Sequence, residues 1–290
     1  MQFPARPWPT GLAETPEPLV RRVLAGNASA FSFTGTQTYL VGAGADLAVI
    51  DPGPDESDHL DALLAAIGDA RVIAIACTHT HRDHSPAAAP LAALTGAPVI
   101  GCAALTLEDD GPRSDAAFDD SYAPDRVLED GEQIAGQGWT LTALATPGHT
   151  SNHLCFALEQ SGALFTGDHV MGWSTTVVSP PDGDMTAYMA SLQLLQRRED
   201  RVYYPAHGPA VEKPRQLVRG MIGHRRQREN QILRHLGEGI GLIEAMVPQM
   251  YNGIDRQLWG AAGRSVLAHL IDLEARGLVR RDGTGWKQAA

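Results

Sequence analysis

The sequence is poor in cysteine and contains no long hydrophobic run. Its 290 residues include three cysteines, Cys77, Cys102 and Cys155, which are too few and too scattered for a disulfide framework or an all-thiolate zinc site. No apolar run approaches the roughly 20 residues that a membrane-spanning helix requires. The Pro-rich segment 1–18 lacks the apolar core of a secretion signal. We therefore expect a cytoplasmic protein that does not enter a membrane.

Positive charge is also scarce. Lys and Arg number 23 against 34 Asp and Glu, which gives a formal net charge of -11. Such a balance disfavours binding to duplex DNA and to anionic membranes, although a local basic patch can override it. Acidic residues gather between positions 102 and 126, namely Glu108, Asp109, Asp110, Asp115, Asp119, Asp120 and Asp125. This segment is expected to be a solvated surface loop or an acidic lid.

Histidine, in contrast, is concentrated in one short motif. His79, His81, Asp83 and His84 follow the apolar run 72–77, which predicts a buried strand that ends at the motif. Strand ends are rigid places for metal ligands. On an irregular loop alternate residues converge, whereas the adjacent Asp83 and His84 point elsewhere. The motif therefore predicts two metal ions.

Short strand patterns alternate with helical ones from about residue 31. Strands are expected at 38–41, 47–50, 72–77, 98–100, 139–145, 154–158, 163–166 and 202–204, with helices through 60–67, 86–95 and 185–195. Ser85 and Pro86 are expected to be the N-cap and the first residue of the second helix. The alternation predicts an α/β protein, and its two strand-rich halves predict a sandwich of two mixed sheets.

The chain becomes helical after residue 213. A helix with a basic run through Arg225, Arg226 and Arg228 comes first, and a break at 237–239 ends it. Two further helices and a short strand are expected over 240–283. That order is the outline of a winged helix-turn-helix.

Three strands of the second half end in small residues followed by a candidate metal ligand. These candidates are His149, Asp168 and His207. Glycines at the strand ends let the backbone turn sharply and approach a metal closely. The three residues are therefore expected to complete a site for two ions.

The ligand order H-x-H-x-D-H, followed by H, D and H, resembles the metallo-β-lactamase superfamily over residues 31 to 210. The chain is more closely similar to the β-lactamase-like protein 2 subfamily in segments 35–41, 146–150 with His153, 172–177 and 224–229. The resemblance implies a four-layer αβ/βα sandwich followed by a small winged-helix domain. It divides the chain into an N-terminal extension (1–30), a metallo-β-lactamase domain (31–212), a connecting helix (213–236) and a winged-helix domain (237–290).

The resemblance also implies ligands and chemistry. His79, His81 and His149 would hold one ion, Asp83, His84 and His207 the other, and Asp168 would bridge them. Imidazole and carboxylate donors without thiolates suit two Zn²⁺ ions, with Mn²⁺ or Fe²⁺ as alternatives. Such a pair generates a bridging hydroxide at neutral pH. Asp83 is expected to orient the water or to carry its proton to the leaving group.

Six further residues have candidate roles around the ligands. His169 and Trp173 are expected either to contact substrate or to serve in ordinary packing, His169 because it departs from the family pattern. His59, His224, His235 and His269 lie outside the ligand pattern and are predicted to be surface or packing residues. A supporting role behind the ligands is left open for His224 alone.

Membership of this superfamily would fix the reaction type, hydrolysis, better than the substrate. A small acyl ester or thioester ranks ahead of single-stranded RNA, because the acidic surface opposes the phosphate binding that the basic helix 213–228 would allow. Hydrolysis of β-lactams is expected at most as a side activity, since genuine metallo-β-lactamases usually have Cys or Ser at the position of Asp168.

A non-enzymatic alternative is a ligand sensor that binds DNA through the winged helix. Residues 240–290 carry six basic against five acidic residues, and domains that read DNA are usually more basic. We expect this module instead to help form the substrate channel or a homodimer contact.

Overall fold

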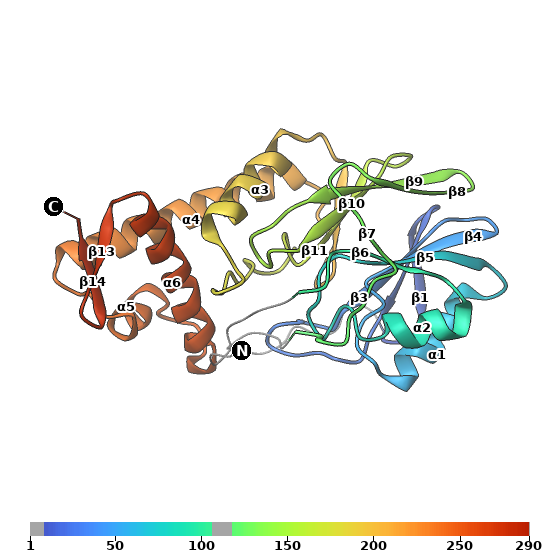
Figure 1. The fold of residues 1–290 in the computed structure, drawn as a ribbon, viewed down its shortest axis with the longest axis horizontal. Coiled ribbons are helices and arrows are strands. Elements are labelled where there is room, and N and C mark those ends of the chain that lie inside the picture. The colour runs from blue at the N-terminus through green and yellow to red at the C-terminus, as the bar shows by residue number, and fades with distance from the viewer. Residues whose placement is uncertain (1–8, 106–117, 290) are drawn as a thin grey trace.

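Two β-sheets packed face to face, with helices on both outer faces, form the larger part of the molecule (Figure 1). The computed structural model describes residues 9–105 and 118–289. The first sheet contains, in spatial order, β1 (Ala13–Glu17), β2 (Val20–Leu24), β3 (Gln37–Val41), β4 (Asp46–Ile50), β5 (Arg71–Cys77), β6 (Val99–Gly101) and β7 (Arg126–Val127). The second contains β12 (Val202–Pro205), β11 (Ala163–Gly167), β10 (Leu154–Leu158), β9 (Trp139–Ala145) and β8 (Gln133–Gly136). This arrangement confirms the expected four-layer sandwich.

Helices connect three of the pairs of neighbouring parallel strands. α1 (Ser57–Ile67) joins β4 to β5, α2 (Ala88–Thr95) joins β5 to β6, and α3 (Met185–Arg197) joins β11 to β12. Parallel strands need such long connections, whereas antiparallel neighbours such as β10 and β11 are joined by the short turn 159–162. α1 and α2 cover the first sheet, and α3 with the start of α4 (Pro214–Gly237) covers the second.

Alternate residues of the second sheet face different cores. Phe156 and Phe165 pack toward the first sheet, where Phe165 contacts Tyr39. Cys155 and Leu164 face α3 and α4. Successive strand residues point to opposite faces, so a sheet covered on both faces needs strands that are apolar throughout. The hydrophobic runs in the sequence meet this requirement.

The N-terminal segment contributes two strands that the sequence analysis missed. β1 and β2 pair antiparallel with each other, and β2 pairs with β3. Val20 and Val23 are fully buried on opposite faces of β2, Val20 toward the second sheet and Val23 toward α1. β1 contains Pro16 and two glutamates, so it lacks the apolar alternation by which strands are recognised. The predicted domain boundary at residue 31 therefore leaves out part of the first sheet, and the boundaries at 213 and 237 stay predictions.

The predicted start of α2 was wrong. Ser85 does not cap this helix, which begins at Ala88; its hydroxyl donates instead to Asp119 Oδ2 at 2.7 Å. The backbone N–H of Gly53 donates to the His84 carbonyl, and that of Ala87 donates to the Gly53 carbonyl. The segment is tied to the loop after β4, so it holds the histidine motif instead of adding a helical turn.

The acidic segment is partly structural. Glu108, Asp109, Asp110 and Asp115 lie outside the described residues. Asp119 is buried and accepts hydrogen bonds from the Ser85 and Ser121 side chains. Asp125 accepts a hydrogen bond from the N–H of Val99 at 2.8 Å. These two carboxylates hold neighbouring backbone in place.

α4 leads into a C-terminal module with its own core. The module consists of α5 (Ile243–Met250), the 3-10 helix η1 (Arg256–Leu258), α6 (Trp259–Ala275) and a hairpin of β13 (Val279–Asp282) and β14 (Gly285–Gln288). Val266 and Leu270 of α6 are fully buried within it. Helices followed by a β-hairpin confirm the expected winged helix-turn-helix. The module docks on α3, where Thr186 donates to Asp272 Oδ1 at 2.6 Å.

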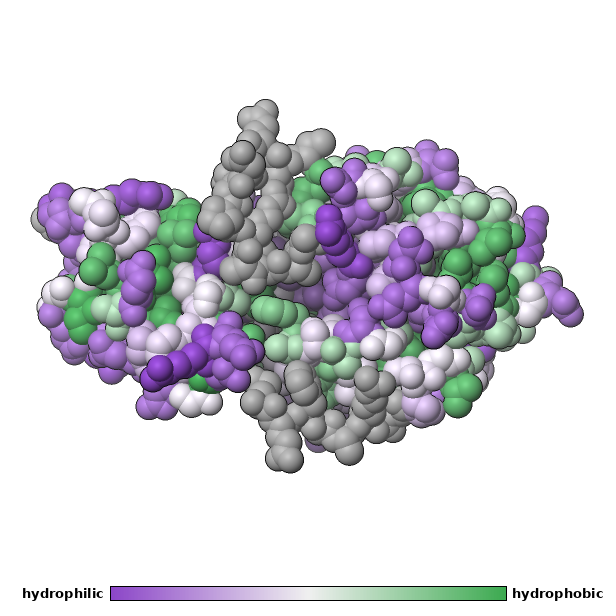
Figure 2. Space-filling model, turned by 90° about the horizontal axis from the view of Figure 1, so that it is seen from below, coloured by the Kyte–Doolittle hydropathy of each residue, from purple (hydrophilic) through white to green (hydrophobic). Residues whose placement is uncertain are grey.

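Polar and apolar side chains are interspersed over the surface of this module, which lies at the left of Figure 2. In the described part of the chain, no helix has both the length and the apolar character needed to cross a membrane.

Candidate metal centre

Seven predicted ligands converge where strands of the two sheets end. The turn after β5 carries His79, His81, Asp83 and His84, and the segments after β9, β11 and β12 carry His149, Asp168 and His207. β5 belongs to the first sheet and the other three strands belong to the second. The centre therefore lies at the edge shared by both sheets, where the ends of rigid strands fix the side chains.

One group of ligands consists of three histidines. His81 Nδ1 lies 3.0 Å from His79 Nε2 and 3.2 Å from His149 Nε2. All three side chains are buried. Asp168 completes this group, whose potential ligand atoms lie within 4.8 Å of one another.

A second group consists of Asp83, His84 and His207. His207 Nε2 lies 3.2 Å from Asp83 Oδ2, and His84 Nε2 lies 3.6 Å from Asp83 Oδ1. Asp168 also reaches this group, because its Oδ1 lies 3.3 Å from His207 Nε2. Its other oxygen lies 3.7 Å from His149 Nε2 in the first group. One carboxylate thus faces both groups.

Hydrogen bonds on the far side of the rings fix which nitrogen faces the centre. His149 Nδ1 donates to the Val177 carbonyl at 2.7 Å, and His207 Nδ1 donates to the Gly35 carbonyl at 3.2 Å. A carbonyl oxygen only accepts, so Nδ1 carries a hydrogen in both rings and Nε2 is the nitrogen that faces the centre. Partners of this kind orient the histidines of metal sites.

Asp51, which the sequence analysis did not identify, organises the histidine turn from behind. It is buried and accepts hydrogen bonds from Thr78 N at 2.7 Å, Thr78 Oγ1 at 2.8 Å and His84 Nδ1 at 3.1 Å. Thr78 Oγ1 in turn accepts from His79 Nδ1 at 3.0 Å. The available signal was its position at the end of β4, because β4 pairs in parallel with β5 and both strands end at the same edge.

The donor set fits divalent metal ions. Asp83 Oδ1, His84 Nε2, Asp168 Oδ1 and His207 Nε2 are buried atoms without a hydrogen-bond partner among the described residues. Burial lowers the pKa of His81 to about 3 and holds the pKa of His79 well below its usual value. Both rings are therefore neutral, and unshared lone pairs meet at the centre. Unpaired buried polar atoms cost about 1–3 kcal/mol each, a cost that bound cations would remove.

Negative charge is retained at the centre. Burial alone would raise the pKa of Asp83 and Asp168, but the neighbouring His84 and His207 hold both values below the ordinary range for aspartate. Nearby positive charge stabilises the ionised form of a carboxyl group in this way. The two carboxylates supply the anionic part of the cation site.

The structure separates the two residues predicted to contact substrate. His169 is fully buried between the rings of His153 and Tyr188, at centroid distances of 5.7 and 4.7 Å. Trp173 stacks on Phe33 at 4.7 Å and lines a cavity. Trp173 is therefore accessible from a cavity, whereas His169 lies behind the centre.

The remaining histidines lie outside both ligand groups. His59 is buried, its Nε2 lies 3.0 Å from Thr38 Oγ1, and burial lowers its pKa to about 4. His269 is buried in α6 and His235 is half-buried at the end of α4. His224 lines the same cavity as Trp173. His153 Nε2 accepts a hydrogen bond from the backbone N–H of Asp168 at 3.3 Å and so holds the backbone that carries this carboxylate.

Two family models match the chain. One, described as the metallo-beta-lactamase superfamily, matches residues 32–207. The other, described as the beta-lactamase associated winged helix domain, matches residues 243–286. The two matches correspond to the sandwich with its metal centre and to the C-terminal module.

Relatives and a solved structure are similar over most of the chain. An atrochrysone carboxyl ACP thioesterase of Aspergillus fumigatus is 34% identical over 221 residues, which cover 74% of this chain and 64% of the relative. A beta-lactamase-like protein 2 homolog of Caenorhabditis elegans is 32% identical over 228 residues, which cover 76% of this chain and 71% of the relative. The fold matches that of a metallo-beta-lactamase family protein from Thermus thermophilus, with a TM-score of 0.74, 22% identity and coverage of 94% and 99% of the two chains.

Proposed function

The chain belongs to the metallo-beta-lactamase superfamily and is a hydrolase with a histidine and aspartate metal-binding site, and from that premise we propose that it hydrolyses an acyl thioester or a small ester. The observation that carries the proposal is the convergence of seven donors with four buried ligand atoms unpartnered among the described residues. A relative named as a thioesterase supports the substrate class.

In this proposal the ligands act as two sets joined by one carboxylate. His79, His81 and His149 would hold one ion, Asp83, His84 and His207 would hold the other, and Asp168 lies within reach of both groups. Zn²⁺ suits imidazole and carboxylate donors, with Mn²⁺ and Fe²⁺ as alternatives. Two such ions, when bound, would supply Lewis acidity and lower the pKa of bound water.

The residues of the chain position the reactants. The Asp83 side chain is 20% exposed and its Oδ1 has no hydrogen-bond partner in the described part of the chain, so it is available to orient the attacking water and to carry its proton. Water adds to the thioester carbonyl, the C–S bond breaks, and the proton passes to the departing sulfur. No cysteine competes as the nucleophile, since burial raises the pKa of the Cys77, Cys102 and Cys155 thiols and the thiol form is unreactive.

Single-stranded RNA is the second candidate, supported by the beta-lactamase-like protein 2 relative and by exposed arginines on α4. Two arginines of the predicted basic run are not available to bind the phosphate backbone of RNA. Arg225 is buried, and Arg228 donates to the Met250 carbonyl and lies over the Tyr251 ring. The thioester therefore ranks first.

The test offers three kinds of substrate to the zinc-loaded protein and measures their hydrolysis. These are neutral thioesters, a fluorescent single-stranded RNA, and nitrocefin as the probe for β-lactamase side activity. We expect thioester cleavage, and loss of both bound metal and activity in His81→Ala and Asp168→Ala. His235→Ala, outside the ligand groups, is the control and should retain both. A different result would favour a nuclease instead of a thioesterase. In that case the wild type cleaves RNA but no thioester, and an Asp83→Ala preparation does not cleave RNA. Full activity of either ligand variant would refute the metal assignment.

A further inference from the structure

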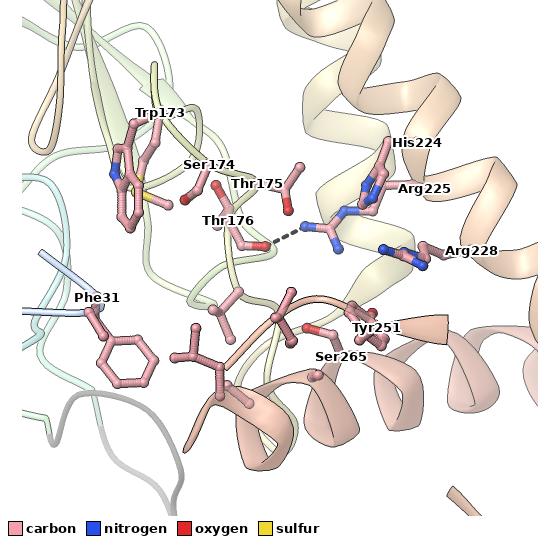
Figure 3. Close-up of a pocket in the computed structure, with 17 residues that line it drawn as sticks. Phe31, Trp173, Ser174, Thr175, Thr176, His224, Arg225, Arg228, Tyr251 and Ser265 are labelled. Atoms are coloured by element: carbon pink, nitrogen blue, oxygen red, sulfur yellow. Dashed lines mark hydrogen bonds between the residues drawn. The ribbon is translucent and has the colours of Figure 1, made fainter. Parts of the chain in front are cut away.

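A cavity of about 260 Å³ lies between the sandwich and the C-terminal module. One wall is the loop from Met171 to Val177, and the others come from α4 and from residues 251–265 (Figure 3). Phe31 closes one side. The volume of the cavity is close to the lower end of the range for small-molecule pockets, about 300–1,000 Å³.

Two arginines of α4 bring positive charge to this cavity. Arg225 is only 3% exposed; one terminal nitrogen donates to the Thr176 carbonyl, and its Nε has no partner among the described residues. Arg228 donates to the Met250 carbonyl, and its Nε also has no hydrogen-bond partner among the described residues. Within residues 9–105 and 118–289, no carboxylate forms an ion pair with either guanidinium. Buried charges are normally paired, so this cluster is complementary to an anion.

The rest of the lining is apolar and aromatic. Phe31, Trp173 and Tyr251 supply rings, and Met171, Val177, Ile254 and Leu258 supply aliphatic surface. His224 adds no charge at neutral pH, because burial and then Arg225 lower its pKa to about 4. A free phosphate ion would leave this surface unused. The lining matches an organic acid with a hydrophobic body.

The cavity adjoins the metal centre through two contacts. Val177, in its wall, provides the carbonyl that accepts from His149 Nδ1 at 2.7 Å. Trp173 packs so closely on Gly208 that a Cβ at Gly208 would lie 2.7 Å from the indole Cδ1, and Gly208 follows the ligand His207. Residues of the cavity wall thus pack directly behind His149 and beside the residue that follows His207. Figure 3 shows Arg225 and Arg228 on the side of the cavity opposite Trp173.

We propose that this cavity binds the acyl part of the substrate, and that this acyl group is a hydrophobic, preferably aromatic, unit with a carboxylate at its far end. The proposal rests on the proposed function. The carboxylate lies at Arg225 and Arg228, the ring lies among Phe31, Trp173 and Tyr251, and the thioester lies at the metal end. Hydrolysis with water then yields a thiol and an acid that carries two carboxylates.

The first test measures binding and needs no turnover. Calorimetry on the zinc-loaded full chain compares 2-naphthoate with the neutral 2-naphthamide, which has nearly the same shape. We expect naphthoate to bind at least tenfold more tightly, and we expect Arg225→Gln and Arg228→Gln each to abolish most of that preference. Arg234→Gln removes an exposed charge from the same helix outside the cavity and should leave the preference unchanged.

Three results would overturn the assignment. The first is a preference that survives in both cavity variants, since the carboxylate would then be bound elsewhere, for example by the metals. The second is equal affinity for inorganic phosphate and naphthoate, which would make the apolar lining irrelevant. The third is no binding of naphthoate by the wild type. Because Arg225 is buried, its substitution could destabilise the fold. Thermal unfolding of each variant, together with the result for Arg228→Gln, distinguishes loss of the binding site from loss of the fold.

The second test separates this inference from the proposed function. The N-acetylcysteamine thioester of benzoate is compared with that of 4-carboxybenzoate. We expect the charged substrate to have a KM at least tenfold lower, with the advantage lost in Arg228→Gln and kcat nearly unchanged. Hydrolysis of both without preference would overturn the inference and leave the function standing. Binding of naphthoate through the arginines with no hydrolysis of either thioester would keep the acid site and refute the thioesterase.

Discussion

Asp51 is the residue on which the orientation of the histidine turn depends most. Its backbone φ of 47° is a conformation that non-glycine residues rarely adopt, and such strain persists where the surroundings enforce it. The side chain accepts three hydrogen bonds, from Thr78 and from His84 Nδ1. The residue therefore fixes one proposed ligand directly and another, His79, through Thr78.

We predict that Asp51→Asn lowers zinc affinity about 10- to 100-fold, the usual effect of removing a partner behind a metal ligand. A competition titration with a chromophoric chelator measures this. Asp184→Asn is the matched control, because Asp184 is the N-cap of α3 and Asn caps equally well. Equal zinc affinity of the Asp51 variant and the wild type would show that Asp51 does not orient His84.

Gly167, directly before Asp168, allows the ends of β11 and β5 to approach. Its φ is 48°, and an added Cβ would lie 2.6 Å from Thr78 Oγ1 and 2.7 Å from His153 Nε2. We predict that Gly167→Ala costs about 3 kcal/mol or more of unfolding free energy, through backbone strain together with the clash. Gly138→Ala isolates the strain, since Gly138 has a φ of 80° and no described atom within 4 Å of its Cβ position; it should cost about 1 kcal/mol. Urea denaturation compares the two, and similar losses would contradict the clash.

His269 makes stability depend on pH. It is buried in α6, neither ring nitrogen has a hydrogen-bond partner among the described residues, and burial, with Arg225 nearby, lowers its pKa to about 3. Between pH 6.5 and 3 the unfolded chain binds the proton and the folded chain does not, so this residue reduces stability as the pH falls. From about pH 7 to pH 5, protonation of His269 in the unfolded chain lowers the unfolding free energy of the wild type by about 2 kcal/mol. The His269→Phe variant should lack this part of the loss. Denaturation at both pH values checks this, and parallel losses in the two proteins would contradict it.

At the scale of the elements, the sequence predicted the strands that carry the site and missed those at the margins. The strands before the candidate ligands are apolar throughout, because both faces of each sheet are covered, and such runs are recognisable. β1 is polar and contains Pro16, and it becomes a strand only because β2 is there to pair with it. Local pattern does not contain that information.

The same distinction applies to the candidate site. The convergence of seven side chains was predictable, since each one closely follows a strand. Asp51 was missed because its role depends on the parallel pairing of β4 with β5. Arg225 and Arg226 are adjacent in one basic run, yet Arg225 is buried against the Thr176 loop and Arg226 is exposed. Only the packing of α4 against the sandwich separates them.

The N-terminal strands are predicted to be part of the fold. Val23 in β2 is fully buried on the face of the first sheet that α1 covers, whereas Leu12 is 61% exposed. We expect Val23→Ala to lower the unfolding free energy by about 2 kcal/mol, and Leu12→Ala, a similar truncation at the surface, to change it by less than about 0.5 kcal/mol. Denaturant titration provides both values. A negligible effect at Val23 would mean that the segment is an extension outside the core of the fold.

At the scale of the whole molecule, the C-terminal module forms a wall of the cavity as well as a domain of its own. Arg264 of α6 donates to the Pro180 carbonyl and to Ser179 Oγ, and the same helix supplies Ala261, Ala262 and Ser265 to the lining. Ala268 and His269 of α6 are buried, and the helix contacts α3. This packing covers much of the helix that a winged-helix protein would need to contact DNA, and it favours a role in shaping the substrate pocket.

Removing the Arg264 contact should loosen the module while leaving the sandwich intact. In Arg264→Ala we expect amide hydrogen exchange in α6 to become at least tenfold faster with exchange in β10 and β11 unchanged, because the stability of a docked element depends on its own contacts. The preference of the cavity for naphthoate over naphthamide should fall in parallel. Arg256→Ala is the control, since Arg256 is exposed and lies over Trp259 within the module. Faster exchange in α6 with an unchanged preference would show that the module does not shape the acid site, and the pocket would then belong to the sandwich and α4 alone.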